Sequence, residues 1–196
     1  MQITVRLFFA LMLAALSAVS LAQTFPQKSI RFLVGFAPGG STDIVARLIA
    51  QKMSENIGQQ VVVDNRTGAG GIIATEALSK SPPDGYTIFA CTTGTFAIQP
   101  FMYSKLPYNV EKDLVPVTQT GSLPYIIVVH PSLPVKNVKE FLAFAKPRPG
   151  QLNYASSGVG TGSHLSTAYF NTAAGIDVTH VPYKGTGQAM GDLLGG

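Results

Sequence analysis

The stretch FLVGFAPGGSTDIVARLIA, residues 32–50, decides the fold class. An apolar strand expected at 29–36 runs into a turn rich in glycine, serine and threonine, and the chain leaves this turn as a helix expected at 42–58. The apolar residues of the helix recur near a period of 3.6, and Gly58 is a suitable stop. Similar successions of apolar strand, glycine-rich turn and helix follow along the chain. They predict an α/β fold with a parallel sheet that is covered on both faces.

The same reasoning places the other elements. Strands are expected at 60–65, 87–92, 114–121, 125–130, 152–157 and 178–184, and helices at 72–81, 137–146, 163–175 and after Lys184. The pattern changes after residue 113, and the Pro-containing link between strands 114–121 and 125–130 is a place where the chain could pass to another lobe. We therefore expect a first α/β lobe at 23–120 and a second at 121–196. Because the second set of strand–helix units has only begun at Gly196, we expect the second lobe to be incomplete.

The first 22 residues have the pattern of an export signal. Arg6 precedes the apolar run LFFALMLAALSAVSLA, and Ser20-Leu21-Ala22 fits the small-residue rule for cleavage. An uncleaved membrane anchor is the alternative, but the apolar run is short for a bilayer span. The signal predicts export. The single cysteine, Cys91, lies in an apolar run and is expected to be a small core residue rather than a nucleophile.

The charge pattern argues against nucleic acid as a partner. The formal net charge is +4, and charged residues make up only 12% of the chain. The basic residues are dispersed, without the clusters or interleaved aromatic residues of a nucleic-acid surface. A mild positive excess is compatible with anionic ligands but does not identify them.

Three strand-to-helix corners suit an anion: APGGSTD at 37–43, TTGTF at 92–96 and SSGVGTGSH at 156–164. A fourth corner, TGAGG at 67–71, is similar in character. In open α/β sheets, ligands bind beyond the carboxyl ends of the strands, where helix N-termini expose unpaired N–H groups. A nucleotide is disfavoured, since no corner contains lysine or the glycine spacing of a phosphate loop. Each corner taken alone could also be a tight turn with a helix cap.

No set of residues predicts catalysis. Asp43 lies in the first turn of its helix, where an acid that stabilises the helix start is expected rather than a general base. His164 also opens a helix and is expected to be neutral, while His130 and His180 are expected to be structural. No spacing of histidines and cysteine suggests a metal site, and no G-x-S-x-G motif is present. We therefore predict no catalytic residue, no metal and no cofactor.

At these corners the sequence resembles the periplasmic solute-binding proteins of tripartite tricarboxylate transporters, the Bug or TctC family. The matching segments include FPQKSIRFLVGFAPGGSTDIVARLIAQKMSENIGQQVVVDNRTGAGG, SPPDGYTIFACTTGT, LNYASSGVGTGSHLS and THVPYKGTGQAMGDLLGG. The resemblance implies a two-lobed periplasmic-binding-protein fold, type II-like, with a cleft between the lobes. It implies a periplasmic, monomeric receptor that captures a small organic di- or tricarboxylate and delivers it to the transporter's membrane permease subunits.

The resemblance also implies which residues bind the ligand. These are Ala37, Pro38, Gly39, Gly40, Ser41, Thr42 and Asp43 in the first loop; Thr92, Thr93 and Thr95 in the second; and Ser156, Ser157, Gly158, Thr161 and His164 in the second lobe. In the first loop, 39–42 would supply donors, Asp43 would brace the helix start, and Ala37 and Pro38 would shape water-bridged contacts. A further turn, PYKG, adds Tyr183 and Lys184. Two other functions stay open: an exported α/β enzyme acting on a small organic acid, and a ligand-dependent signalling receptor.

Overall fold

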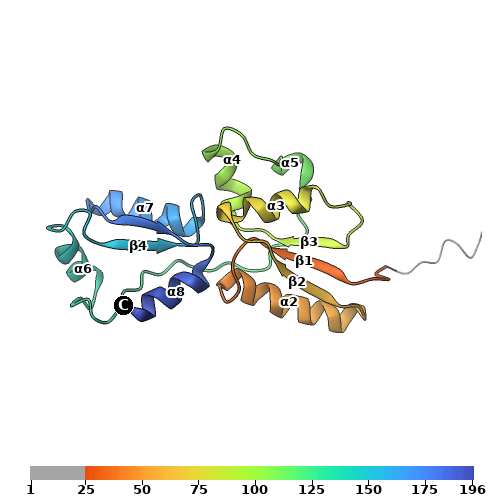
Figure 1. The fold of residues 1–196 in the computed structure, drawn as a ribbon, viewed down its shortest axis with the longest axis horizontal. Coiled ribbons are helices and arrows are strands. Elements are labelled where there is room, and N and C mark those ends of the chain that lie inside the picture. The colour runs from red at the N-terminus through yellow and green to blue at the C-terminus, as the bar shows by residue number, and fades with distance from the viewer. Residues whose placement is uncertain (1–24) are drawn as a thin grey trace, which may run out of the picture.

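The structure, a computed structural model, describes residues 25–196, and the expected export signal lies outside them. The chain forms two groups of strands and helices, joined by an extended segment (Figure 1). In chain order the elements are β1 (Ile30–Val34), α2 (Ser41–Ile57), β2 (Val61–Asn65), η1 (Ala69–Gly71), α3 (Ile72–Ser79), β3 (Thr87–Ala90), η2 (Gly94–Ile98), α4 (Gln99–Met102), α5 (Val110–Asp113), α6 (Val138–Ala145), β4 (Asn153–Ser156), α7 (Gly162–Ala174), β5 (Thr179–Pro182) and α8 (Thr186–Gly195).

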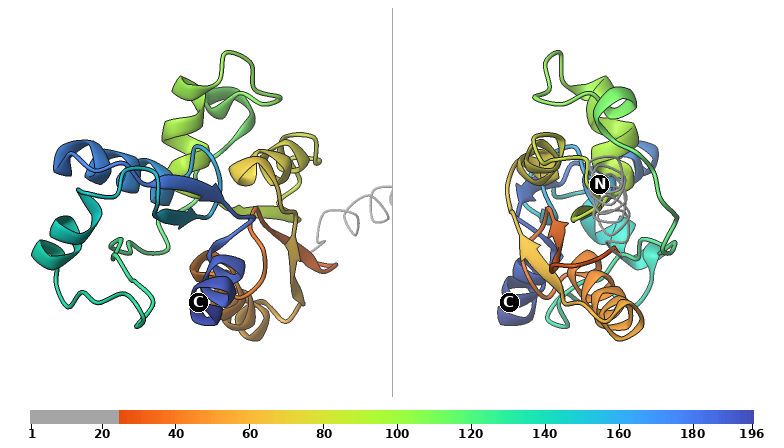
Figure 2. Two further views of the ribbon diagram at one scale, coloured as in Figure 1. Left: turned by 60° about the vertical axis from the view of Figure 1, so that its left-hand side comes forward. Right: turned by 90° about the vertical axis from the view of Figure 1, so that its right-hand side faces the viewer.

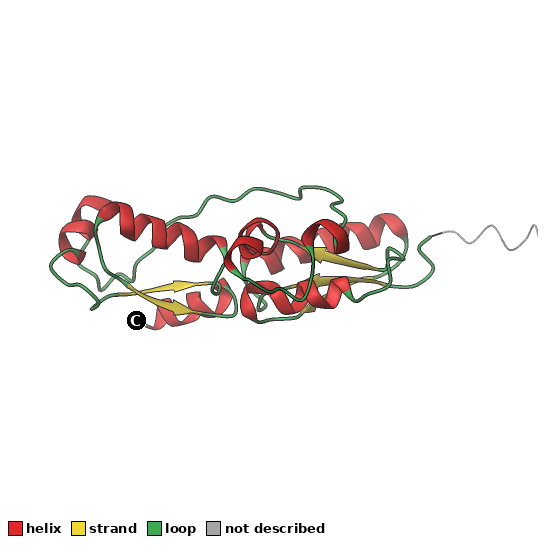
Figure 3. Cartoon of the chain, turned by 90° about the horizontal axis from the view of Figure 1, so that it is seen from above, coloured by secondary structure: helices red, strands yellow, loops and turns green. Residues whose placement is uncertain are grey.

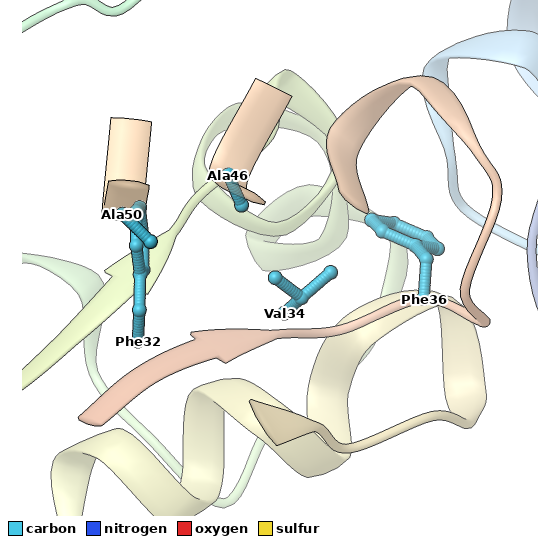
Figure 4. Close-up of a cluster of buried hydrophobic side chains, with 5 residues drawn as sticks. All are labelled: Phe32, Val34, Phe36, Ala46 and Ala50. Atoms are coloured by element: carbon cyan, nitrogen blue, oxygen red, sulfur yellow. The ribbon is translucent and has the colours of Figure 1, made fainter. Parts of the chain in front are cut away.

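The first lobe is built on a parallel sheet with the strand order β2-β1-β3. The central strand β1 is buried on both faces, as its continuous apolar sequence predicts. Phe32, Val34 and Phe36 point to one face and pack against Ala46 and Ala50 of α2 (Figure 4). The small alanines let the helix approach the sheet closely. The predicted parallel sheet is confirmed, and so are the helix at 42–58 and its stop at Gly58, which has φ +68°.

The second lobe has a two-stranded parallel sheet, β4-β5, accompanied by α6, α7 and α8. The register pairs Tyr154 with His180 and Ser156 with Pro182. The helix α6 begins after Asn137, whose side chain accepts a hydrogen bond from the Glu140 N–H, as expected of an N-cap. The two sheets lie end to end (Figures 1 and 3), and Figure 2 shows α8 running back from the junction to the C-terminus.

The expected strands at 114–121 and 125–130 are wrong. Residues 114–130 form no strand, and Val115 and Val117 are each 88% exposed. A strand needs a neighbour to pair its backbone N–H and C=O groups, and this segment runs from one lobe to the other without such a neighbour. The expectation for Cys91 is also wrong: the residue is exposed, just beyond the end of β3.

Candidate functional site

Glycines allow the two lobes to meet backbone to backbone. A Cβ atom added to Gly70 would lie 2.5 Å from the carbonyl oxygen of Val159, and one added to Gly158 would lie 3.2 Å from the Cα of Gly70. Gly94 lies similarly close to the Gly160 carbonyl oxygen, at 3.1 Å from its added Cβ. The corners that follow the strands of the first lobe therefore lie directly against the loop that follows β4. We call this contact, formed by residues 70, 94 and 158–160, the glycine seam.

The first predicted loop lies against the start of α8. The Ala37 N–H donates to the Lys184 carbonyl oxygen at 2.8 Å, which joins the lobes through their backbones. A Cβ added to Gly40 would lie 2.8 Å from the Thr186 hydroxyl, and one added to Gly187 would lie 2.6 Å from the Pro38 carbonyl oxygen. The APGGSTD corner thus meets the second lobe at the turn that precedes α8.

A cavity of about 160 Å³ lies between the lobes at the glycine seam. Its lining residues are Gly35, Phe36, Gly68, Ala69, Gly70, Ser157, Gly158, Val159, Pro182, Tyr183 and Lys184. Pockets for drug-sized ligands start at roughly 300 Å³, so this cavity suits a smaller molecule. Lys184 is the one charged side chain in the lining, and it is positive. The cavity therefore favours a small anion.

Some helices begin after a glycine, and others begin after a residue whose side chain caps them. Glycines precede α2, α3 and α8, at Gly40, Gly71 and Gly185, and none of the three helices has a side-chain cap. By contrast, Asn109 and Asn137 cap α5 and α6 through their side chains. The starts of α2 and α8 meet at the junction of the lobes, where Gly40 contacts Thr186 and Gly185 contacts Ala37. Their first N–H groups are left to donate to a ligand or water, whereas the first N–H of α3, from Ile72, donates to the Ala69 carbonyl oxygen.

Asp43 is a structural anchor of the first loop, as expected. Its carboxylate, 2% exposed, accepts hydrogen bonds from the Gly39 N–H at 3.0 Å, from Arg47 Nε at 3.0 Å and from Asn65 Nδ2 at 2.8 Å. Burial acts to raise the pKa of Asp43, but these hydrogen bonds and the charge of Arg47 outweigh it, so the pKa lies below its usual value. The ionised carboxylate fixes the turn. The Gly39 N–H is engaged inside the chain.

The residues of the second loop divide between the interior and the surface. The Thr95 hydroxyl is buried and donates to the Thr92 carbonyl oxygen at 3.0 Å, while Thr93 is exposed. The Thr92 hydroxyl oxygen is buried and has no hydrogen-bond partner in the part of the chain that the structure describes. A buried hydroxyl without a partner is costly, which makes Thr92 the member of this loop most suited to meet a ligand or water.

The second-lobe loop is held by its own hydroxyl groups. Thr161 caps α7 by accepting from the His164 N–H at 3.4 Å and donates to the Gly158 carbonyl oxygen at 2.7 Å. Ser157 Oγ lies 2.9 Å from Ser163 Oγ. Ser157 and Gly158 line the cavity, whereas the Thr161 hydroxyl is used within the loop. His164 Nδ1 accepts from the Gly160 N–H at 3.3 Å, which fits the expected neutral imidazole.

The structure adds cavity residues that are absent from the predicted ligand set. They are Gly35, Phe36, Gly68, Ala69, Gly70, Val159 and Pro182. Three of them, Gly68, Ala69 and Gly70, belong to the fourth glycine-rich corner, TGAGG, which the sequence had indicated. After Thr67 this corner contains no serine or lysine side chain that could bind a ligand. Conversely, the predicted ligand residues 37–43, 92, 93, 95, 156, 161 and 164 lie outside the cavity lining. Their role in ligand binding stays a prediction.

No group of three or more histidine, cysteine, aspartate or glutamate side chains within residues 25–196 could hold a metal ion. No helix there has both the length and the apolar composition needed to cross a bilayer.

Comparison with known proteins identifies relatives along most of the chain. The model of the "Tripartite tricarboxylate transporter family receptor" (TctC) matches residues 45–196. The chain is 43% identical over 172 residues to the "UPF0065 protein in tcbD-tcbE intergenic region" of Pseudomonas sp. strain P51, covering 88% of this chain and 51% of the relative. It is 40% identical over 184 residues to "Protein BugT" of Bordetella pertussis, covering 93% of this chain and 56% of the relative. The chain thus spans about half the length of these curated relatives.

Solved structures of the same kind have the same fold. "R. palustris Rpa4515 with adipate" is 38% identical with a TM-score of 0.79, over 87% of this chain and 57% of that one. "MatC (Rpa3494) from Rhodopseudomonas palustris with bound malate" is 34% identical with a TM-score of 0.80, over 86% and 57%. "Periplasmic binding protein BugD" is 33% identical with a TM-score of 0.76, over 87% and 57%. The predicted periplasmic-binding-protein fold is confirmed. These relatives are solute receptors and not enzymes.

Proposed function

Because the chain belongs to the tripartite tricarboxylate transporter receptor family, we propose that it captures a small organic carboxylate between its two lobes and delivers it to a membrane permease. The observation that carries this proposal is the meeting of two glycine-capped helix starts, those of α2 and α8, at the junction of the lobes. Each start offers backbone N–H groups and the positive end of a helix dipole, and the cavity at the glycine seam has one charged lining residue, Lys184, directly before Gly185.

The size of the cavity and its donors support a di- or tricarboxylate of a few carbons. Rpa4515 and MatC, whose structures contain adipate and malate, support the same class of ligand. A single exposed helix end contributes only about 0.3–1 kcal/mol to anion binding. Several ends that act together in a closed cleft offer useful affinity. The family and its structural neighbours are solute receptors and not enzymes, which supports release of the ligand unchanged.

Isothermal titration calorimetry tests ligand capture. Adipate, malate and citrate are each titrated into the chain, with hexanediol as a neutral analogue of adipate and circular dichroism as the check of folding. We expect at least one acid to bind and the diol to give no signal, because N–H groups and Lys184 recognise the carboxylate. A folded chain that binds none of the acids, or that binds the diol equally well, contradicts the proposal.

Delivery to the permease and a periplasmic location are the finer parts of the proposal. The name of BugD as a periplasmic binding protein and the export-signal pattern of residues 1–22 support the location. A pull-down of the transporter's membrane subunits, with and without the bound acid, tests delivery. We expect capture to depend on the acid. Equal capture in both conditions, or capture of a sensor kinase instead, contradicts the transport role.

A further inference from the structure

Three rings are stacked beside the second-lobe ligand loop. His180 of β5 lies between Tyr154 of β4, at a centroid distance of 4.8 Å, and His164 of α7, at 4.2 Å. The planes are nearly parallel, at 21° and 19°. The β4–β5 register explains one contact, since it sets Tyr154 directly opposite His180 on the same face of the sheet. The stack links the sheet to the first turn of α7.

His180 also holds the loop through Ser156. Its Nε2 lies 2.6 Å from Ser156 Oγ, and Ser156 is 2% exposed. The same Oγ accepts from the Gly158 N–H at 3.1 Å. A hydroxyl has one proton, and the short distance to Nε2 fits donation to an unprotonated imidazole nitrogen. Neutral His180 therefore fixes Ser156, and Ser156 fixes the backbone of Gly158, which lines the cavity.

Protonation of His180 removes this arrangement. The Nε2–H would then donate to Ser156 Oγ, and the serine proton would have to turn to another acceptor. The Gly158 carbonyl oxygen, 3.3 Å away, already accepts from the Thr161 hydroxyl at 2.7 Å. The Ser156 hydroxyl thus loses its 2.6 Å hydrogen bond to His180 Nε2 as a donor. In its place it has only a 3.3 Å bond to a carbonyl oxygen that already accepts from Thr161. Burial and the neighbouring His164 already lower the pKa of His180, so the folded loop prefers the neutral ring.

The surroundings offer His180 no compensating negative charge. The titratable groups that contact its ring are Tyr154 and His164. On the turn after β5, Lys184 is positive, and Asp192 of α8 accepts a hydrogen bond from the Tyr183 hydroxyl. Within residues 25–196, no salt bridge joins a carboxylate to His164 or His180. A positive charge on His180 would therefore have no carboxylate partner.

We propose that His180 is a positioning residue of the ligand cleft: while it is neutral it holds loop 156–161 against the glycine seam through Ser156, and its protonation releases the loop. The receptor then binds its acid less tightly as the pH falls below about 6.5, the usual histidine pKa. The part of this inference that concerns ligand affinity rests on the proposed function. The part that concerns the loop does not.

Amide hydrogen exchange by NMR tests the loop without ligand. The protection factor of Gly158, whose N–H donates to Ser156 Oγ, is corrected for the intrinsic pH dependence of exchange and measured at about pH 7.5 and about pH 5. We expect it to fall about fivefold at the lower pH, the effect of losing one hydrogen bond, while protection of β1 stays unchanged. Unchanged loop protection, or an equal loss in β1, overturns the inference, whether or not any acid binds.

Variants separate the titration from the packing. His180→Gln keeps a hydrogen-bonding group near Ser156 but does not titrate, so we expect a protected loop at both pH values. His180→Phe keeps a stacked ring but has no hydrogen bond to Ser156, so we expect low protection of the loop at both pH values. His130→Gln is the control, since His130 is only partly buried and its ring bonds only to Ser132. It should behave as the parent chain does. A pH dependence that survives in His180→Gln overturns the inference.

Discussion

Gly70→Ala tests whether the lobes close on a ligand through the glycine seam. Gly70 has φ +62°, so an alanine there meets the strain of a left-handed residue, about 1–2 kcal/mol. Its Cβ would also lie 2.5 Å from the Val159 carbonyl oxygen, where ordinary contact begins at 3.4 Å. The lobes would have to part by about 0.9 Å. Overpacking of this kind costs about 1–3 kcal/mol, which corresponds to a loss of affinity of about fivefold to 150-fold.

Gly58→Ala is the matched control. Gly58 has nearly the same φ, +68°, but a Cβ there has nothing within 4 Å. Urea unfolding should show a loss of about 1–2 kcal/mol from the shared backbone strain in both variants, and a further loss in Gly70→Ala because the lobes of this structure already meet at Gly70. Calorimetry with adipate or malate should show a loss of affinity for Gly70→Ala alone. Equal affinities in the two variants would refute the reasoning, since the seam would then not form in the liganded protein.

Three more predictions concern single residues. Asp43→Asn should lower the unfolding free energy by about 1–3 kcal/mol near neutral pH, because the bonds to Arg47 and Asn65 lose their ionised acceptor. Since folding lowers the pKa of Asp43, its contribution to the unfolding free energy is present above the usual value of 3.8 and is lost as the pH falls through the lower folded value. Urea titrations at several pH values should show this loss in the parent chain and not in the variant. Lys184→Gln should weaken adipate binding by up to about fivefold and make it less sensitive to salt, with unchanged thermal stability, because the side chain is exposed; calorimetry at two salt concentrations measures this. Asn137→Ala should lower the unfolding free energy measured in urea by about 1 kcal/mol, because α6 loses its N-cap. The affinity for the acid should not change, because α6 starts away from the cleft. A change in affinity would contradict the view that side-chain-capped helix starts do not bind the ligand.

Local patterns in the sequence predicted most elements of the fold. The apolar run of β1 and the 3.6 period of α2 reflect contacts with neighbours close in the chain, so both were correctly placed. The segment 114–130 has equally apolar residues, yet it is extended without pairing. Whether an apolar run becomes a strand depends on a partner strand, which local sequence does not reveal.

The site was predictable in kind but not in detail. Glycine-rich corners after strands indicated an anion site at the junction, and Asp43 in a first helical turn indicated a brace. The approach of Gly70 to Gly158 depends on how two distant corners meet, and so does the bond between Ser156 and His180, 24 residues apart. His180 was expected to be merely structural, because its strand gives no sign that a ligand-loop serine lies beside it.

The most direct test of the account is NMR mapping of the backbone amides as adipate is added to the chain. We predict that saturable shifts concentrate on the first amides after Gly40 and Gly185, because these N–H groups lie at the junction without side-chain caps, and on Gly158, because it lines the cavity. The amides that follow Asn109 and Asn137 should not move. Saturable shifts elsewhere, with the amides of the junction unchanged in a folded chain, would contradict the claim that open helix starts hold the carboxylate.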